Sequence, residues 1–400
     1  MRTTEADFLI IGGGIVGLSI GNQILKLKPE SHVIIAEKEI GLGEHASGRN
    51  SGVLHAGFYY SPDSLKAKFC RQGNFELRQI ISKHSIEIRE TGKVVVAKND
   101  EELIRLKKLF QRGVTNGVKV ELLPASELIN YEPLAKTYKE FLWSPTTAVS
   151  DPHAVLAAIS KEFVSSGGVL LTNSEILIDK SQAVYLNGEK INPGIVINSA
   201  GVNALNIAHK FDIGLEYALL PVLGMYKTIS DDQLPLKTLV YPVPDPRNPF
   251  LGVHFTLTTD NKVKIGPTAI PVVGREQYSG LRGIDFQDIA ESIKAVRGLL
   301  RGSAGGLLKL AATEFPKIST SYLINCAKDL VPSVSNTGKW KKKQPGLRAQ
   351  LVNKKTGEFE QDFVVRKSGK FVHILNAVSP GWTAAIPFAN WIIETHIELD

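Results

Sequence analysis

The sequence predicts an α/β protein that combines a discontinuous domain built on a parallel sheet with a second domain built on antiparallel sheet. The prediction rests on two observations. Residues 7–37 have the pattern of strand, helix and strand around a glycine-rich turn, which is how a parallel sheet begins. Residues 215–275 instead alternate short β-rich runs with proline turns, as in YPVPDPRNP at 241–249, and this is typical of antiparallel sheet.

The turn after the first strand has the spacing GxGxxG, formed by Gly12, Gly14 and Gly17. Gly12 permits a tight turn, Gly14 lets the backbone approach a pyrophosphate at the helix N-terminus, and Gly17 lets helix and strand pack closely. Glu37 ends the next strand, where a carboxylate can accept hydrogen bonds from a ribose diol. The spacing predicts a bound dinucleotide rather than a plain glycine turn. Because the motif occurs once, a second nicotinamide-binding fold is not expected.

The remaining elements follow from apolar periodicity and turn residues. A glycine- and serine-rich loop occupies residues 41–52. We expect helices at 64–83, 100–116, 152–165 and 383–396, and strands at 93–97, 169–172, 194–201 and 371–376. Residues 285–330 are expected to be mostly helical, with interruptions at Gly302 and at Gly305 and Gly306.

The α/β pattern occurs on both sides of the β-rich stretch, so the first domain is expected to be split. We assign residues 1–80, 150–205 and 346–400 to this domain. Residues 81–149 and 206–345 are assigned to the second domain, which would hold a substrate.

The composition is that of an ordinary globular protein of 400 residues, with 43% hydrophobic and 22% charged residues. Only Cys70 and Cys326 are cysteines, which argues against a disulfide framework and fits a reducing, cytoplasmic compartment. The N-terminal apolar stretch is accounted for by the strand, turn and helix, so it is not expected to be a signal peptide. No apolar run approaches the roughly 20 residues that a spanning helix needs.

The formal charge of +7 favours anionic ligands or surfaces. The densest basic run, KWKKK at 339–343, is expected to be a solvated loop, and contact with an anionic membrane surface is the alternative. Nucleic acid is not expected as a partner, because no basic motif interleaved with aromatic residues accompanies the run. The nine histidines show no metal-binding spacing, so no metal site is expected.

Several motifs, in order along nearly the whole chain, point to a known family. They are NSGVLHAGFYY at 50–60, SLKAKFC at 64–70, YPVPDPRNPFLGVH at 241–254, GLRAQ at 346–350 and NAVSP at 376–380. Through them the chain resembles the FAD-dependent oxidoreductases of the D-amino-acid-oxidase superfamily and, more narrowly, the L-2-hydroxyglutarate dehydrogenases and oxidases. The resemblance implies FAD as the cofactor, held by a Rossmann-like domain of the GxGxxG type, with an antiparallel-sheet substrate domain.

The resemblance also places the cofactor contacts, from the glycine turn to the C-terminal turn. They fall on Gly12, Gly14, Gly17, Glu37, Lys38, Ser47, Gly48, Asn50, Ser51, Ala200, Gly201, Ser379, Pro380, Gly381 and Trp382. For Ala200 and Gly201 the alternative is a plain strand-to-helix turn. His45 stands where some superfamily members attach FAD covalently, and an ordinary loop histidine is the alternative.

Two histidines are the candidates for the catalytic base, because an imidazole takes up a proton near neutral pH without large retuning. His55 lies just past the loop expected to face the flavin, and His254 ends a strand-like run in the substrate domain. One of them would move the proton while the other binds substrate. For either, a structural histidine bonded to backbone is the alternative.

Arg348 is the candidate for gripping a substrate carboxylate, because its planar fork binds carboxylates through two hydrogen bonds. A surface arginine is the alternative. The hydroxyls of Tyr59, Tyr60 and Tyr241 are candidates for a second carboxylate, and aromatic packing is the alternative for each.

Two segments depart from the family pattern. The chain has GRNSG at 48–52 where the family usually has GHNSG, and SPGWTA at 379–384 where the family usually has SPAATS. Arg49 and Trp382 are therefore expected to reshape the pocket.

The expected reaction is oxidation of a short 2-hydroxy acid, most specifically L-2-hydroxyglutarate to 2-oxoglutarate, by hydride transfer to FAD. The resemblance allows a quinone or oxygen as electron acceptor. A cytoplasmic protein that touches the inner membrane peripherally would suit the basic run. The alternatives are an amino-acid or amine oxidase of the same superfamily and a flavin-binding partner protein without catalysis.

Overall fold

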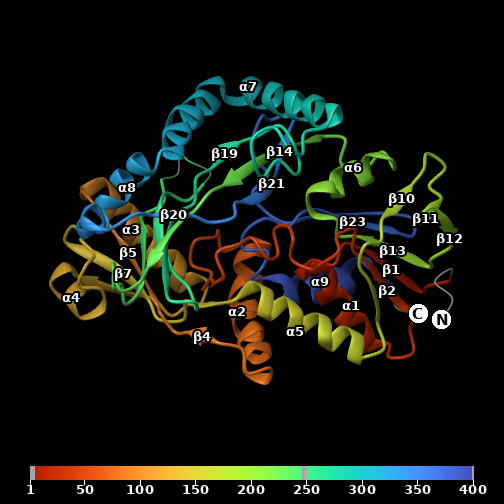
Figure 1. Cartoon of the computed structure of the whole chain (residues 1–400), viewed down its shortest axis with the longest axis horizontal. Helices are drawn as coiled ribbons and strands as arrows, with labels where there is room; N and C mark the ends of the chain where they lie inside the picture. The colour runs from red at the N-terminus through yellow and green to blue at the C-terminus, as the bar shows by residue number, and fades with distance from the viewer. Residues whose placement is uncertain (1–4, 246–247, 249, 399–400) are drawn as a thin grey trace.

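A parallel sheet forms the centre of the first domain (Figure 1). The computed structural model describes residues 5–245, 248 and 250–398, and for residues 301–310 the backbone only. In spatial order the strands are β22 (Val364–Ser368), β23 (Phe371–Asn376), β13 (Ile195–Asn198), β1 (Phe8–Ile11), β2 (Val33–Ala36) and β9 (Val169–Leu171). All neighbours are parallel except β22 and β23. Their near-continuous apolar runs are typical of strands buried on both faces.

Alternate side chains of β1 enter two different cores. Phe8 and Ile10 face a core shared with four helices, while Leu9 and Ile11 face a core closed by a small antiparallel sheet. The helices are α1 (Ile15–Leu27), α2 (Leu65–Lys83), α5 (Pro152–Ser165) and α9 (Ala385–His396). The small sheet consists of β10 (Ile176–Ile178), β11 (Val184–Leu186) and β12 (Glu189–Ile191). The sheet is thus covered on both faces. The glycine turn, which joins β1 to α1, lies at the edge of the sheet where β1 ends.

Side-chain caps begin the helices where the sequence predicts them. Ser64 caps α2, Asp151 caps α5 and Asn99 caps α3 (Asp100–Thr115), each by accepting a hydrogen bond from a backbone N–H of the first turn. The last helix, α9, begins at Ala385 rather than at Thr383, because Ala384 is its N-cap residue.

A larger mixed sheet forms the second domain and joins the two chain segments expected to build it. In spatial order its strands are β20 (Lys341–Lys342), β15 (Lys227–Ser230), β18 (Lys262–Gly266), β17 (His254–Leu257), β16 (Leu239–Pro242), β5 (Lys93–Val96), β7 (Glu140–Ser144) and β6 (Glu121–Pro124). The sheet is antiparallel as predicted, except where β5 and β16 run parallel. This one junction brings residues from near 93 and near 241 together.

Helix α7 (Phe286–Glu314) spans the top of the molecule and packs on a small sheet (Figure 1). That sheet consists of β19 (Ile270–Pro271), β14 (Tyr217–Gly224) and β21 (Gly346–Asn353). The expected interruptions at Gly302, Gly305 and Gly306 are wrong, because the helix runs through all three. Contact with β14 and β21 outweighs the cost of about 1 kcal/mol for each helical glycine.

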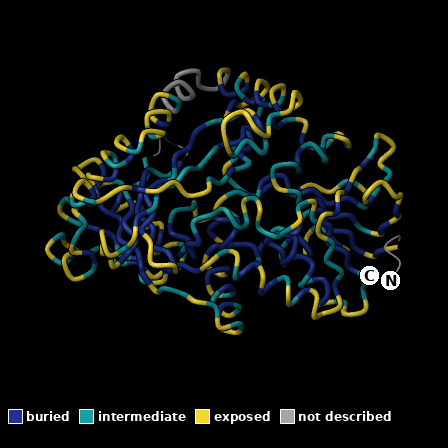
Figure 2. The backbone as a smooth tube through the Cα atoms, in the orientation of Figure 1, coloured by how far each residue is buried: buried dark blue, intermediate teal, exposed yellow. Residues whose placement is uncertain are grey.

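The remaining elements are short and connect these layers. They are β3 (Val53–Leu54), β8 (Ala148–Ser150), β4 (Ile88–Arg89), η1 (Ala125–Glu127), α4 (Leu128–Tyr131), η2 (Gly201–Asn203), α6 (Ala204–His209), η3 (Phe315–Ile318), α8 (Thr320–Lys328) and η4 (Pro332–Asn336). Figure 2 shows both large sheets as buried backbone, with exposed backbone on the outer helices and loops. In the part of the chain that the structure describes, no helix is long and apolar enough to cross a bilayer.

Candidate active site

A cavity of about 960 Å³ lies between the two large sheets. One wall consists of the turns that follow β1, β2, β13 and β23, at the carboxyl ends of the parallel strands. This is where ligands bind in open α/β sheets. The opposite wall comes from the strands β14, β16, β17 and β21. The cavity therefore has a nucleotide end at the glycine turn and a reactive end at the substrate domain.

At three positions of the glycine turn, the close approach of neighbouring atoms leaves no room for a Cβ. Gly12 has φ +101°, and a Cβ there would lie 2.7 Å from the carbonyl oxygen of Ser199. A Cβ on Gly17 would lie 2.2 Å from the carbonyl oxygen of Gly12. A Cβ on Gly14 would fill the space 2.9 Å from the hydroxyl of Ser47. The turn is thus closed to side chains and open to a close-fitting phosphate group.

Polar side chains hold this turn in place. Glu37 accepts a hydrogen bond from the backbone N–H of Gly13 at 2.8 Å. The hydroxyl of Ser47 accepts one from the backbone N–H of Ile15 at 3.0 Å, which ties the 41–52 loop to the start of α1. Both residues also line the cavity, so the groups that shape the turn face the ligand space.

The structure places most of the expected cofactor residues on the cavity wall. These are Gly12, Gly14, Glu37, Lys38, Ser47, Asn50, Ser51, Ala200, Gly201, Ser379, Pro380, Gly381 and Trp382. Two others lie behind the wall. Gly17 is the close contact between helix and strand, and Gly48 packs where a Cβ would lie 2.4 Å from Cε1 of His153. Both therefore shape the wall from behind.

His55 and His254 meet at the reactive end, one from each domain. The backbone N–H of His55 donates to the hydroxyl of Thr383 at 3.2 Å, and its Nδ1 has no hydrogen-bond partner among the described residues. His254 pairs its Nδ1 with the carbonyl oxygen of Gly252 at 2.8 Å. Since a carbonyl only accepts, the Nδ1 of His254 carries the proton and its Nε2 keeps a lone pair in the uncharged ring.

Both imidazoles are held in the uncharged form. Burial is the main cause that lowers the pKa of His254 to about 3; the charges of Lys93, Lys264 and Arg348 act in the same direction, and the bond to Gly252 opposes them. Burial also lowers the pKa of His55 well below its usual value, with the charges of Lys93, His254 and Arg348 acting in the same direction. Both rings are therefore proton acceptors at neutral pH.

Arg348 enters the reactive end from β21. Its guanidinium lies 5.2 Å from the ring of Phe250, and no hydrogen bond or ion pair within the described residues holds it. Tyr226 and Tyr60 are the polar groups that face it, and burial raises the pKa of Tyr226 to about 12. An unpaired guanidinium beside a cavity is the arrangement that receives a carboxylate.

The tyrosines expected to bind substrate are placed differently from one another. Tyr241 lines the cavity, and its ring stacks on His254 with centroids 3.9 Å apart. Tyr60 bonds to Ser379 of the C-terminal turn. Tyr59 does not line the cavity, and its buried hydroxyl has no partner among the described residues. Of the three, Tyr241 is the one that meets both the cavity and a candidate base.

Sequence reasoning missed four side chains of this region: Lys93, Tyr226, Lys264 and Tyr278. Lys264 is buried, donates to the carbonyl oxygen of Ser51 at 2.6 Å, and has a pKa lowered by burial to about 7. Each comes from a strand or loop whose sequence shows apolar alternation or turn residues, and no motif marks it. Tertiary pairing alone brings these residues to this region, where Tyr226 and Tyr278 line the cavity and Lys93 and Lys264 lie behind its wall.

The loop at 273–283, here called the strap, reaches from the second domain to the nucleotide end. The hydroxyl of Tyr278 lies 2.7 Å from Nδ1 of His45, and Glu276 lies 2.9 Å from Nζ of Lys38. Arg49 stacks on the ring of Tyr278 with its Cζ 4.1 Å from the centroid. Arg49, where the chain departs from the family pattern, therefore contacts the strap.

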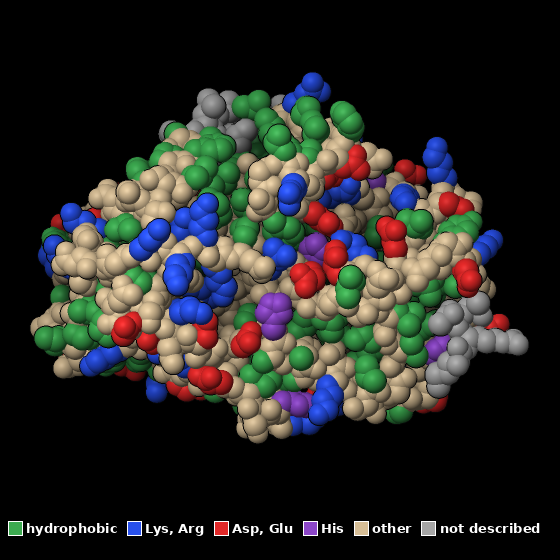
Figure 3. Space-filling model, viewed as in Figure 1, with side chains coloured by type: hydrophobic (Ala, Val, Ile, Leu, Met, Phe, Trp, Pro, Cys, Tyr) green, Lys and Arg blue, Asp and Glu red, His purple; other side chains and the backbone are tan. Residues whose placement is uncertain are grey.

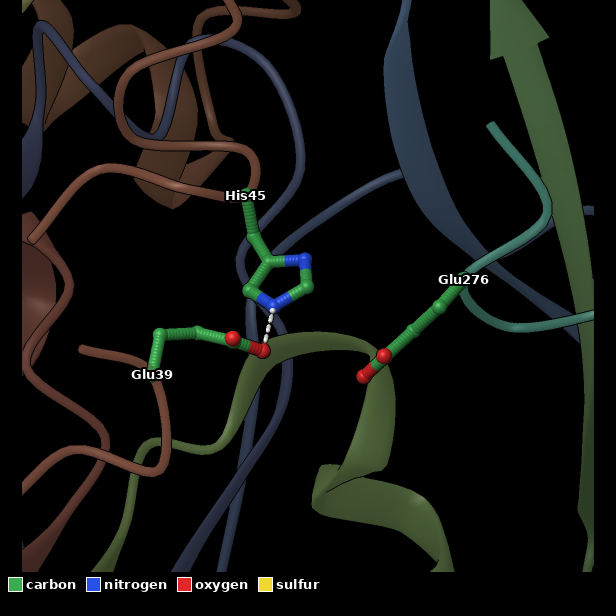
Figure 4. Close-up of side chains that lie close together, drawn as sticks. All are labelled: Glu39, His45 and Glu276. Atoms are coloured by element: carbon green, nitrogen blue, oxygen red, sulfur yellow. Dashed lines mark hydrogen bonds and ion pairs between the residues drawn. The ribbon is translucent and has the colours of Figure 1, made fainter. Parts of the chain in front are cut away.

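Glu39, His45 and Glu276, the last of which belongs to the strap, form a cluster (Figure 4). Their carboxylate oxygens and imidazole nitrogen lie within 4.8 Å of one another. Nε2 of His45 lies 2.8 Å from Glu39, and the ammonium of Lys38 contacts both carboxylates. Lys38 thus already supplies the positive charge that these carboxylates need. Both nitrogens of His45 have partners in this arrangement, Tyr278 and Glu39.

The second departure, Trp382, lies on the cavity wall at the C-terminal turn. Its side chain is 9% exposed, and its indole N–H has no partner among the described residues. The residue thus forms part of this wall while its indole nitrogen is buried.

A dinucleotide turn, two uncharged imidazoles and an unpaired arginine around one cavity define a cofactor-dependent oxidoreductase. Residues 7–395 match the family model DAO, "FAD dependent oxidoreductase", and the chain belongs to this family. FAD is accordingly the cofactor. The residues present fit it, because the glycine turn leaves no room for a Cβ and the carboxylate of Glu37 lines the cavity beside this turn.

Curated relatives are similar over nearly their whole length. The L-2-hydroxyglutarate dehydrogenase of Escherichia coli strain K12 is 32% identical over 408 residues, which cover 97% of this chain and 92% of the relative. The mitochondrial L-2-hydroxyglutarate dehydrogenase of Homo sapiens is 31% identical over 98% of this chain and 89% of its own.

Solved structures share the fold. The FAD-bound L-α-glycerophosphate oxidase of Mycoplasma pneumoniae superposes with a TM-score of 0.76 at 23% identity, covering 98% of this chain and 94% of its own. The glycine oxidase of Geobacillus kaustophilus superposes with a TM-score of 0.71 at 17% identity, with the same coverage of both chains. These likenesses confirm the predicted fold class.

Proposed function

We propose that this protein oxidises L-2-hydroxyglutarate to 2-oxoglutarate. The observation that carries the proposal is the reactive end, where the unpaired guanidinium of Arg348 and the uncharged rings of His55 and His254 face one cavity. A 2-hydroxy acid needs these two features, an anchor for its carboxylate and an acceptor for its hydroxyl proton. Curated relatives of that name, about a third identical over nearly the whole chain, support the choice of acid.

The reaction removes a hydride from C2 of the substrate and a proton from the hydroxyl on C2. The single bond between C2 and this oxygen thereby becomes a C=O bond. FAD, when bound, would supply the acceptor for the hydride and its two electrons. Arg348 binds the C1 carboxylate and so fixes the position of C2. One of the two histidines takes the hydroxyl proton on its ring nitrogen, and the Nε2 of His254 is already a free acceptor. Tyr241 and Phe250 contribute aromatic rings to the wall at this end.

The test is anaerobic loss of the bound flavin's visible absorption on addition of L-2-hydroxyglutarate, with the D-enantiomer as control. We expect fast bleaching with the L-enantiomer alone. If the flavin stays oxidised with both enantiomers, the substrate assignment is wrong. Bleaching by an amino acid or amine instead would favour the oxidase alternative, and bleaching by none of these would favour a non-catalytic flavin protein.

We infer that the electron acceptor is a quinone or oxygen and that the face bearing α7 can contact a membrane. Apolar side chains of α7 stand in solvent at helical spacing: Phe286, Ile289, Ile293 and Leu300. Figure 3 shows hydrophobic side chains along this upper edge and Lys and Arg side chains over the region of β20. Within the basic run, Lys341 and Lys342 are exposed, whereas Trp340 is buried and therefore cannot anchor the chain in lipid.

Sedimentation with phospholipid vesicles tests this contact. We expect binding to anionic vesicles that weakens with salt, and further weakening when Ile289 and Ile293 are replaced by Ser. Equal sedimentation with and without vesicles at low salt would contradict the inference. Turnover with a soluble quinone, compared with oxygen, then identifies the acceptor.

A further inference from the structure

Lys93 is a buried lysine that the proposed reaction does not use. It is the first residue of β5, its side chain has 0% exposure, and its Nζ has no hydrogen-bond partner among the described residues. Buried charges in proteins are normally paired, because an unpaired one loses its hydration without compensation. An unpaired lysine in this position therefore needs a reason.

Three aromatic rings surround the Nζ of Lys93. The centroids of Tyr241, Tyr59 and Phe58 lie 4.3, 5.0 and 5.2 Å from it. An ammonium against several ring faces is stabilised by cation–π attraction, which does not require a carboxylate. The cage keeps Lys93 in place without neutralising its charge.

This cage is joined directly to the reactive end. Tyr241, the ring closest to Lys93, stacks on His254 with centroids 3.9 Å apart and an interplanar angle of 22°. Tyr241, His55 and His254 line the cavity, whereas Lys93 does not, so Lys93 lies behind them. It reaches this place through the parallel pairing of β5 with β16, in which Val95 is opposite Tyr241.

We propose that Lys93 is a positioning residue that fixes the stack of Tyr241 on His254 and, by its charge, keeps His55 and His254 uncharged and ready to accept the substrate proton. This inference rests on the proposed function for its catalytic consequence. The arrangement of Lys93 around the two rings does not depend on which substrate is oxidised.

The charges around the two histidines are present in the pH range in which an ordinary imidazole becomes protonated. Burial lowers the pKa of Lys93 to about 7, and the thiol of Cys70 is the titratable group that opposes this. Below that pH Lys93 carries its charge, and this is the range in which an ordinary histidine becomes protonated. Arg348 faces both imidazoles as well, and Lys264 faces His254.

The test replaces Lys93 by methionine in the FAD-bound protein. Methionine keeps the length of the side chain and removes the unpaired charge, so we expect an unfolding temperature equal to or above that of the wild type. The matched control is Lys227→Met, because Lys227 is also a buried lysine on the same sheet and its charge does not act on either histidine.

Two further readouts are compared across pH in the wild type and both variants. The first is NMR of the histidine rings in the oxidised holoenzyme, with signals assigned by His55→Gln and His254→Gln. The second is the rate of flavin reduction by L-2-hydroxyglutarate. In Lys93→Met we expect both imidazoles to become protonated about one pH unit earlier on acidification, and the acid loss of rate to move by the same amount. Lys227→Met should behave as the wild type.

The outcomes separate this inference from the proposed function. If Lys93→Met leaves the ring titrations unchanged, Lys93 does not act on the histidines and the inference fails. A lower unfolding temperature with unchanged titrations would show a purely structural lysine. If L-2-hydroxyglutarate does not reduce the wild-type flavin, the proposed function fails, and the ring titrations still decide the role of Lys93.

Discussion

Nδ1 of His45 lies 2.7 Å from the hydroxyl of Tyr278, although 233 positions separate the two residues in the chain. The contact joins the 41–52 loop of the first domain to the strap of the second. Arg49 stacks on the same tyrosine ring, and Lys38 reaches Glu276 of the strap. All of these except Glu276 line the nucleotide end of the cavity. The strap therefore lies across this end of the cavity, and we expect it to retain bound FAD.

Replacing Tyr278 by phenylalanine should speed the release of FAD. The change removes the hydroxyl that meets His45 and keeps the ring on which Arg49 stacks. A hydrogen bond of this kind contributes about 0.5–1.5 kcal/mol, which corresponds to about two- to tenfold in the dissociation rate constant. The measurement is the rise of flavin fluorescence after dilution of the holoenzyme.

Tyr185→Phe is the matched control, because its hydroxyl also bonds a side chain, Asp179, at 3.0 Å but lies outside the cavity wall. FAD should leave this variant at the wild-type rate. Equal release from the Tyr278 variant and the wild type would mean that the strap does not retain the cofactor.

Arg348→Met should weaken binding of the hydroxy acid about a hundredfold or more. Each hydrogen bond to a charged group contributes about 1.5–3 kcal/mol, and the guanidinium fork can make two to one carboxylate. The dissociation constant comes from the substrate dependence of anaerobic flavin reduction. Arg366→Met is the control, since Arg366 is an arginine of the neighbouring strand β22 that is about half exposed.

A variant of Arg348 that binds substrate normally but reduces flavin slowly would contradict the anchoring role. It would place the guanidinium near the reacting atoms instead of at the carboxylate. The split between the dissociation constant and the limiting rate therefore decides which role Arg348 has.

The nucleotide end was predictable from sequence because its contacts are local. Gly12, Gly14 and Glu37 lie within one strand–helix–strand unit, so their spacing alone specifies the turn. His55, His254 and Arg348 were found through motifs of the family, and the cavity brings all three together. The resemblance, not periodicity, identified this second group.

Lys93 and Tyr278 were not predictable in the same way. Lys93 has the pattern of the first residue of an apolar strand, and only the parallel pairing of β5 with β16 carries it behind Tyr241. Tyr278 lies in a loop, and the turn residues of this loop do not indicate which distant segment the loop contacts. The contact of Tyr278 with His45 depends on how the two domains pack. Pairing between distant segments determines both contacts, and local sequence does not encode it.

Flavin reduction by the hydroxy acid should stay level as the pH falls to about 5. The base must be uncharged to accept a proton, and burial lowers the pKa of His254 to about 3 and that of His55 in the same direction. A base with the ordinary histidine pKa would lose activity below about pH 6.5. Stopped-flow absorbance at a series of pH values measures this. A rate that halves near pH 6.5 would mean that burial does not hold the base uncharged.

Removing the base itself should lower the rate of flavin reduction by about 10²–10⁴ with little change in substrate binding. His55→Gln and His254→Gln are measured side by side, because one ring moves the proton and the other contacts substrate. The variant with the slow rate identifies the base, and the variant with the raised dissociation constant identifies the binding residue. If both reduce flavin at the normal rate, the base is a different group.

A third buried histidine, His373 of β23, should make the protein less stable in acid. Its side chain has 0% exposure, its Nδ1 lies 3.1 Å from the amide nitrogen of Asn198, and its Nε2 has no partner among the described residues. Burial lowers its pKa to about 4. The unfolded chain therefore binds a proton at this ring below about pH 6.5, while the folded chain does so only near pH 4.

The free energy of unfolding should thus not depend on this ring above about pH 6.5. It should fall by a few kcal/mol as the pH drops toward 4. His373→Phe removes the titrating ring that lies beside Phe211 and Phe371, so the unfolding free energy of the variant should depend less steeply on pH in this range. Urea unfolding at several pH values measures the slope, with FAD in constant excess so that cofactor binding does not vary. His32→Gln, at a half-exposed histidine, should keep the wild-type slope. Equal slopes for His373→Phe and the wild type would mean that the buried ring is protonated as easily in the folded chain as in the unfolded one.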